Sequence, residues 1–254
     1  MSLEGKVAFV TGASRRRGIG KAAALALARM GADVVVADLE RAMEGATSVA
    51  QEIAAMGRKS LAIKMDVTDY DDVRKGFAAI KSKLGPVSVL VNNAALMGHN
   101  VTIAKTTVEE WDNEVKVCLN SAFYCMKEAW ADMCANKFGR IVNMTSVAGI
   151  MGGFGQTSYA AAKSGLIGLA KSAALEGARF NITANCVLVG ISATDNHFQL
   201  PEAVREKIEA RTALRRAATP EEVAGAIAYL ASDEGAYMTG AVMNMMGGLD
   251  LFVF

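Results

Sequence analysis

Residues 6–20 read KVAFVTGASRRRGIG, and this stretch decides the fold class. A short apolar run ends at Thr11-Gly12, and Ala and Leu then recur at helical spacing from Ile19 to Met30. Such an order predicts a buried strand, a glycine-rich turn and a helix. Backbone amides of the turn and the N-terminus of the helix favour an anion such as a pyrophosphate. We expect this cradle to be formed by Gly12, Ser14, Arg17, Gly18, Ile19 and Gly20.

The same alternation of apolar strand and helix continues to the end of the chain. Further strands are expected at 33–37, 61–65, 87–91, 140–143, 182–188 and 241–246, and further helices at 41–56, 71–84, 108–136, 158–178 and 221–231. Strands that alternate with helices at this spacing are predicted to pair in parallel, with helices covering both faces of the sheet. We therefore expect an α/β fold with a doubly wound, mostly parallel, seven-stranded sheet of the Rossmann type. Residues 1–254 are expected to form a single domain, with a substrate lid at about 190–219.

The net charge, cysteine spacing and apolar content of the chain exclude several classes of function. The 254 residues carry a net charge of +1, so no basic face for nucleic acid is expected. The four cysteines show neither metal-ligand nor disulfide spacing, which favours reduced thiols in a cytoplasmic protein without a bound metal. No run of about 20 apolar residues exists, so no membrane span is expected.

Polar or small residues follow each of the first strands, where a cofactor would lie in this type of sheet. Asp38 closes the second strand and can accept hydrogen bonds from both ribose hydroxyls of an adenosine, while repelling a 2′-phosphate. This favours NAD(H), although Arg17 argues the other way because it can pair with that phosphate. The remaining strand-end candidates for cofactor binding are Asp66, Val67, Asn93 and Ala94.

Tyr159 and Lys163 lie four residues apart in the sequence YAAAK, and Ser146 precedes Tyr159 by thirteen residues. Residues four apart share one face of a helix, so the Lys163 ammonium is expected beside the Tyr159 phenol. A nearby cation favours phenolate, and we expect it to lower the phenol pKa from about 10 toward neutrality. Such a phenol exchanges a proton with an alcohol oxygen. The spacing alone also arises by chance on a surface helix.

These motifs in this order resemble the short-chain dehydrogenase/reductase family over essentially the whole chain. The resemblance implies hydride transfer between NAD(H) and a secondary alcohol or ketone, including a hydroxyacyl or oxoacyl thioester such as an acyl-CoA. It implies that Tyr159 is the acid/base, that Ser146 hydrogen-bonds the substrate oxygen and that Lys163 binds the nicotinamide ribose. Gly190 and Thr194 are implied at the cofactor, with Thr194 holding its carboxamide.

The chain departs from the family pattern at four places. Five residues, 13–17, separate the first two glycines of the loop, where the family usually has three. Val189 replaces a proline, and Ala95 replaces a glycine after the fourth strand. Cys118 stands where the family has the asparagine that helps to hold a water linking the catalytic lysine to solvent. A thiol is a weak donor and acceptor, and we expect Cys118 to be a small buried hydrophobic side chain without thiol chemistry.

Two functions therefore remain open. The first is an active NAD(H)-dependent oxidoreductase. The second is a degenerate subunit that no longer binds cofactor and supports an active homologue, similar to the inactive kind of subunit in hydroxybenzylsuccinyl-CoA dehydrogenase. The helices at 108–136 and 158–178 resemble the family's packing surfaces, so we expect a homotetramer, or a heterotetramer with a related subunit.

The substrate is expected to be a small molecule, and its pocket is less readable from the sequence. Met97, Met144, Met151 and Phe154 flank the motifs and can line an apolar pocket, although core filling explains methionines equally well. His99 and His197 can contact substrate or lie in solvated loops.

Overall fold

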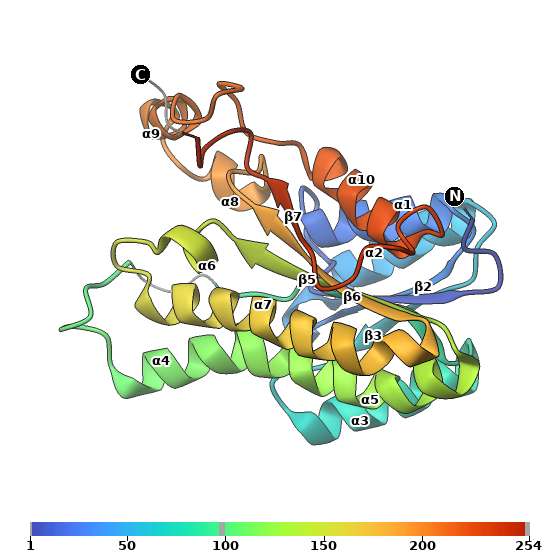
Figure 1. Cartoon of the computed structure of the whole chain (residues 1–254). Coiled ribbons are helices and arrows are strands. Elements are labelled where there is room, and N and C mark those ends of the chain that lie inside the picture. The colour runs from blue at the N-terminus through green and yellow to red at the C-terminus, as the bar shows by residue number, and fades with distance from the viewer. Residues whose placement is uncertain (1, 97–99, 252–254) are drawn as a thin grey trace.

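The computed structural model describes residues 2–96 and 100–251, so Met97 and His99 lie outside the described residues. Its centre is one seven-stranded sheet with the order β3-β2-β1-β4-β5-β6-β7 (Figure 1). Every neighbouring pair of these strands is parallel. The strands are β1 (Val7–Thr11), β2 (Asp33–Asp38), β3 (Ser60–Lys64), β4 (Val87–Asn92), β5 (Gly139–Ser146), β6 (Ile182–Val189) and β7 (Val242–Met245).

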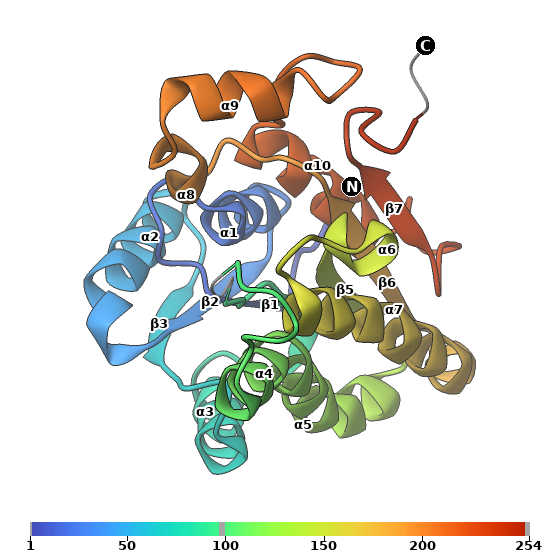
Figure 2. The same ribbon diagram turned by 90° about the vertical axis from the view of Figure 1, so that its left-hand side faces the viewer.

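Helices cover both faces of the sheet, as expected for a doubly wound fold. Helices α1, α2 and α10 pack on one face, and α3, α5 and α7 pack on the other (Figure 2). The helices are α1 (Ile19–Arg29), α2 (Met43–Ala55), α3 (Tyr70–Lys83), α4 (Val108–Val115), α5 (Ser121–Asn136), α6 (Ala148–Met151), α7 (Thr157–Gly177), α8 (Asp195–Phe198), α9 (Glu202–Glu209) and α10 (Pro220–Ala231). Short 3₁₀ turns lie at Glu40–Ala42 and Ala178–Phe180.

The central strands are mostly apolar and buried along nearly their whole length because helices cover both of their faces. All five residues of β1 and all eight of β6 are buried. Side chains of β1 alternate between two cores: Ala8 and Val10 join the core under α1 and α10, whereas Val7 and Phe9 join the core under α3 and α5. This period-two division explains why the sequence shows continuous apolar runs without polar alternation.

The expected elements are present, with two differences outside the segment 190–219, where helices α8 and α9 were not expected either. The stretch 108–136, expected as one helix, contains a π-helical turn, η2 (Lys116–Asn120), between α4 and α5. The short helix α6 was not expected, because four residues with one buried member carry no readable periodicity.

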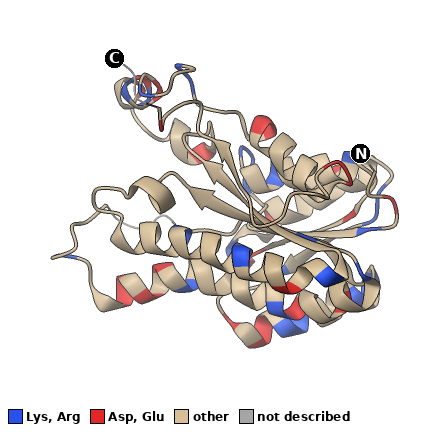
Figure 3. Cartoon of the chain, in the orientation of Figure 1, with Lys and Arg blue, Asp and Glu red and all other residues tan. Residues whose placement is uncertain are grey.

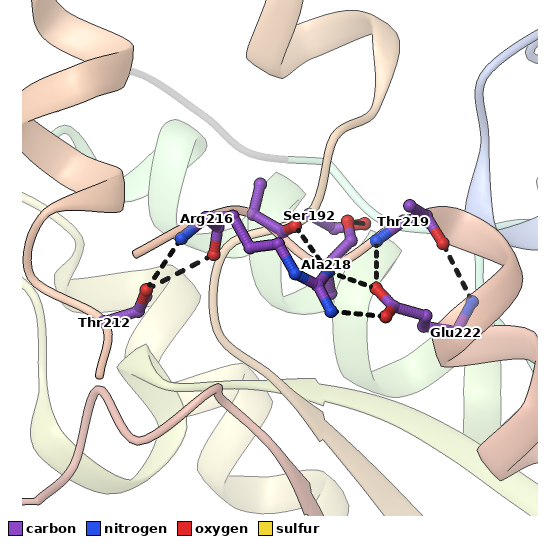
Figure 4. A network of polar contacts seen from close by, with 7 residues as sticks. Ser192, Thr212, Arg216, Ala218, Thr219 and Glu222 are labelled. Atoms are coloured by element: carbon purple, nitrogen blue, oxygen red, sulfur yellow. Dashed lines mark hydrogen bonds and ion pairs between the residues drawn. The ribbon is translucent and has the colours of Figure 1, made fainter. Parts of the chain in front are cut away.

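Residues 190–219 lie over the carboxyl edge of the sheet and hold α8 and α9 (Figure 1). An isolated parallel bridge between Ser192 and Ala218 brings the two ends of this segment, the predicted lid, together. The base of the lid is fastened further by Arg216, which donates two hydrogen bonds of 2.6 Å to the Glu222 carboxylate (Figure 4). Glu222 also completes a capping box with Thr219 at the start of α10.

Charged residues of both signs are interspersed along the outer helices (Figure 3). Within the described residues, no helix is long and apolar enough to cross a membrane. The part of the chain that the structure describes also shows no group of three or more His, Cys, Asp or Glu able to hold a metal ion.

Candidate active site

The three candidate catalytic side chains meet at the carboxyl end of β5. Ser146 is the last residue of β5, and α7 places Tyr159 and Lys163 on one helix face. The Lys163 Nζ lies 5.6 Å from the centroid of the Tyr159 ring, and the Ser146 side chain is near enough to the Tyr159 phenol to lower its pKa. The predicted grouping of these residues is therefore present in the structure.

Lys163 is buried and held by the strand beside it. Its ammonium donates a 2.8 Å hydrogen bond to the Met144 carbonyl, and the Thr145 hydroxyl donates to the Lys163 carbonyl at 2.7 Å. Burial lowers the pKa of Lys163, because a charged form is disfavoured away from water.

The expected lowering of the Tyr159 pKa is not seen. Burial raises the pKa of Tyr159 to about 12, the nearby Ser146 side chain partly opposes this, and the charges of Cys118 and Glu114 raise it further. Loss of solvation therefore outweighs any help that the phenolate receives from Lys163. At neutral pH the phenol is protonated, which makes it a proton donor.

Cys118 lies in the π-helical turn and is only 2% exposed. Its Sγ donates to the Leu96 carbonyl at 3.1 Å and accepts from the Leu96 amide at 3.4 Å. Burial raises the pKa of this thiol. Cys118 thus ties the helix to the segment that follows β4, and the interpretation as a small buried side chain without thiolate chemistry agrees with this geometry.

The loop between β1 and α1, residues 12–18, is called the glycine loop below, and it fits tightly against the end of β4. A Cβ at Gly12 would come within 2.9 Å of the Ala94 Cα, and one at Gly20 would come within 2.6 Å of the Asn93 Nδ2. Asn93 donates from this Nδ2 to the carbonyls of Thr11 and Gly12, both at 2.9 Å. Asn93 and Ala94 therefore shape the loop. Their part in cofactor binding stays a prediction.

Helix α1 begins after Gly18 without a side-chain cap. Its first amides, those of Ile19 and Gly20 among them, consequently have no side-chain acceptor and suit an anion. This arrangement fits the pyrophosphate of a dinucleotide.

The two additional residues of the loop carry its arginines to the lid. Arg15 Nη1 donates to the Asn196 Oδ1 at 2.9 Å, and the Arg17 guanidinium lies 4.6 Å from the Phe198 ring centroid. The backbones join as well: the Arg17 amide donates to the Asp195 carboxylate at 3.2 Å, and the Asp195 amide donates to the Arg17 carbonyl at 3.1 Å. The glycine loop and α8 therefore form one connected unit.

Asp38 ends β2 as expected, but both of its carboxylate oxygens already accept hydrogen bonds. The Ser14 hydroxyl and amide donate to Oδ2 at 2.6 and 3.3 Å, and the Leu39 amide donates to Oδ1 at 2.9 Å. A ribose hydroxyl would share these oxygens with Ser14 or displace it.

The other cofactor candidates lie on the same edge of the sheet. Asp66 accepts from the amide and hydroxyl of Thr68, and the neighbouring Met65 amide donates to the Asp38 carbonyl at 3.0 Å. Val67 is buried. Gly190 allows close packing, since a Cβ there would lie 3.0 Å from the Met246 Cα. Thr194 precedes α8 in extended conformation, and its side chain does not cap this helix.

Sequence reasoning missed a buried acid beside the catalytic helix. Glu114 in α4 is 6% exposed and accepts a hydrogen bond from the Ser158 hydroxyl. The sequence did contain an indication of this burial, because Glu114 lies four residues before Cys118 and therefore shares its helix face. In the structure this face packs against α7. A charged residue is easily assigned to the solvent side when no packing partner is known.

Comparisons with known proteins agree with this architecture. Residues 12–250 match the family model described as enoyl-(acyl carrier protein) reductase. The 3-oxoacyl-(acyl-carrier-protein) reductase FabG of Pseudomonas aeruginosa is 40% identical over 249 residues, which are 98% of this chain and 99% of that protein.

Two solved structures share the fold over nearly their whole length. A putative gluconate dehydrogenase from Agrobacterium tumefaciens superposes with a TM-score of 0.93 at 28% identity, covering 99% of this chain and 98% of that one. A blue fluorescent protein from a metagenomic library, in complex with NADPH, gives a TM-score of 0.91 at 35% identity, covering 98% of this chain and 99% of that one.

Proposed function

The chain belongs to the short-chain dehydrogenase/reductase family, and we propose that it reduces a ketone of the 3-oxoacyl thioester class to the secondary alcohol with NADH. The observation that carries this proposal is the meeting of Ser146, Tyr159 and Lys163 at the end of β5. A proton donor and a hydrogen-bonding hydroxyl at one point are what carbonyl reduction requires of the protein.

The roles of the three residues follow from their environment. A bound reduced nicotinamide supplies the hydride to the carbonyl carbon. Tyr159, protonated at neutral pH, gives its phenol proton to the carbonyl oxygen, and Ser146 hydrogen-bonds the same oxygen. Lys163 supplies positive charge beneath the phenol and has donors besides the one bound to Met144.

Two observations support an acyl substrate. The Pseudomonas relative is named for a 3-oxoacyl thioester, and the segments beside the catalytic residues expose apolar side chains. On and after α6, Ile150, Met151 and Phe154 are 49%, 57% and 91% exposed, and on the lid Phe198 is 45% exposed. Apolar side chains of this kind suit an acyl chain.

The preference for NADH rests on Asp38. Its carboxylate would face the 2′-phosphate of NADPH, and the contacts of Arg15 and Arg17 lead to α8 and not to Asp38. The NADPH complex of the metagenomic protein supports the other cofactor, so relative affinity for NADH and NADPH is the deciding measurement.

A second candidate function is the degenerate subunit, which the contacts of the glycine loop favour. Ser14 already occupies the Asp38 carboxylate, and the loop is joined to the lid at Asp195 and Asn196. In this second function the loop would keep these contacts in place of a dinucleotide, and the chain would serve as the partner of an active homologue.

One experiment separates the two functions. We expect NADH to quench or shift protein fluorescence at micromolar to millimolar concentration, and acetoacetyl-CoA to drive NADH oxidation. Tyr159→Phe should bind NADH unchanged and lower kcat by at least ~100-fold, because the proton donor is lost. Absence of binding at millimolar NADH and NADPH, together with a related chain that co-purifies in fixed stoichiometry, would favour the partner role.

A further inference from the structure

Glu114 is a buried carboxylate that no assigned role explains. It lies on α4, which packs against α7, and its side chain is 6% exposed. The Ser158 hydroxyl donates a hydrogen bond to its Oε2, and Ser158 is the residue immediately before Tyr159. A carboxylate is rarely buried to this extent unless it is hydrogen-bonded, because loss of hydration is costly.

The surroundings of Tyr159 show what this carboxylate faces. Cys118 lies four residues after Glu114, and the charges of both raise the pKa of Tyr159. Lys163 comes from the same helix as Tyr159, and Cys186 of β6 lies near Lys163. Ser146 approaches from β5, and α6 brings no titratable side chain. Glu114 is therefore the carboxylate that, together with Cys118, opposes a phenolate from across the helix interface.

We propose that Glu114 is a positioning residue that anchors the first turn of α7 through Ser158 and, by its negative charge, keeps Tyr159 in the protonated form that can donate to a carbonyl oxygen. The inference rests on the proposed reductase function. The carboxylate disfavours a second negative charge nearby, and this repulsion is strong where water is excluded. Its hydrogen bond with Ser158 fixes the backbone from which Tyr159 projects.

The direct test measures the ionisation of Tyr159 without turnover. Tyrosine labelled with ¹³C at Cζ is incorporated into the whole chain, and the Tyr159 resonance is assigned from its absence in Tyr159→Phe. Glu114→Gln keeps an acceptor for Ser158 and removes the charge. We expect Tyr159 of this variant to ionise at lower pH than in the wild type. Glu109→Gln, at an exposed position of the same helix, should leave the titration unchanged.

Two further variants separate charge from packing. Ser158→Ala retains the carboxylate, so Tyr159 should titrate as in the wild type. The double variant Glu114→Leu with Ser158→Ala replaces the polar pair by apolar side chains and should lower the ionisation pH as Glu114→Gln does, even if the latter folds poorly. A titration that is the same in wild type, Glu114→Gln and the double variant would overturn the proposal, as would a Ser158→Ala shift as large as that of Glu114→Gln.

Kinetics provide the second readout. For carbonyl reduction, the rate falls as Tyr159 loses its proton, so the alkaline limb of kcat/KM against pH should move to lower pH in Glu114→Gln and stay in place in Glu109→Gln. A chain without turnover would contradict the proposed function, while the NMR titration would still support or refute the role of Glu114.

Discussion

For Tyr159, the sequence pattern correctly predicts the neighbouring lysine but wrongly predicts the direction in which the phenol pKa shifts. The spacing to Lys163 predicts proximity, and the structure has it at 5.6 Å. The phenol pKa nevertheless rises to about 12, because burial disfavours phenolate and because Cys118, once it ionises, and the Glu114 carboxylate add negative charge nearby. Burial is a property of the assembled fold, so a four-residue spacing does not contain it.

At Asp38 we predict a change in cofactor preference. Asp38→Ala removes the carboxylate that would repel a 2′-phosphate, so the ratio of NADPH to NADH affinity should rise by about tenfold or more, equivalent to ~1.4 kcal/mol. Titration of intrinsic fluorescence with each cofactor measures it. Ser14→Ala should instead strengthen NADH binding, because Oδ2 becomes free for the ribose. An unchanged ratio in Asp38→Ala would contradict the assignment of Asp38 to the adenosine end.

At the scale of elements, the turn between β1 and α1 depends on glycine for packing. A Cβ at Gly20 would lie 2.6 Å from both the Gly12 carbonyl and the Asn93 Nδ2. We predict that Gly20→Ala lowers the free energy of unfolding by about 1 to 3 kcal/mol, because these atoms must move apart. Urea denaturation followed by circular dichroism measures the change.

The matched control is Gly225→Ala in α10, where a Cβ meets nothing within 4 Å. This substitution should raise the free energy of unfolding by about 0.5 to 1 kcal/mol, since alanine is the better helix former. Equal effects of the two substitutions would show that helix propensity, and not contact with Asn93, governs the turn.

The stretch 108–136 shows where the spacing of apolar residues fails to predict the boundaries of an element. Helical spacing is present throughout, yet η2 at Lys116–Asn120 adds a residue to one turn and places Cys118 against Leu96. π-helical turns carry no distinct apolar period, so the sequence predicts a continuous helix.

At the scale of the whole molecule, we predict a subunit interface on the outer side of α5 and α7. Leu175 and Phe123 are 83% and 47% exposed there. Leu175→Glu should lower the mass found by light scattering, because burying a carboxylate in an apolar interface is costly. Tyr237→Glu, at a fully exposed position elsewhere, is the control. A wild-type chain that is monomeric, or a Leu175→Glu variant that retains the wild-type mass, would contradict this.

The sequence by itself determined the class of fold, the edge of the sheet that carries the site and the three catalytic candidates. Apolar runs such as 6–10, glycines at Gly12 and Gly20, and the Tyr159–Lys163 spacing are local signals, and local geometry translates them directly into strand, turn and helix face. Cofactor contacts assigned by resemblance, Gly190 and Thr194 among them, remain predictions.

Only the tertiary structure decided what surrounds those residues. It placed Ser14 against Asp38, joined the glycine loop to α8 and brought Glu114 into contact with Ser158, the residue before Tyr159. Each of these hydrogen bonds links residues at least 24 positions apart: Ser14 and Asp38 are separated by 24 positions, Glu114 and Ser158 by 44, and Arg17 and Asp195 by 178. Hydrogen bonds and burial between distant segments depend on how helices and loops pack, and no local period of the sequence records that packing.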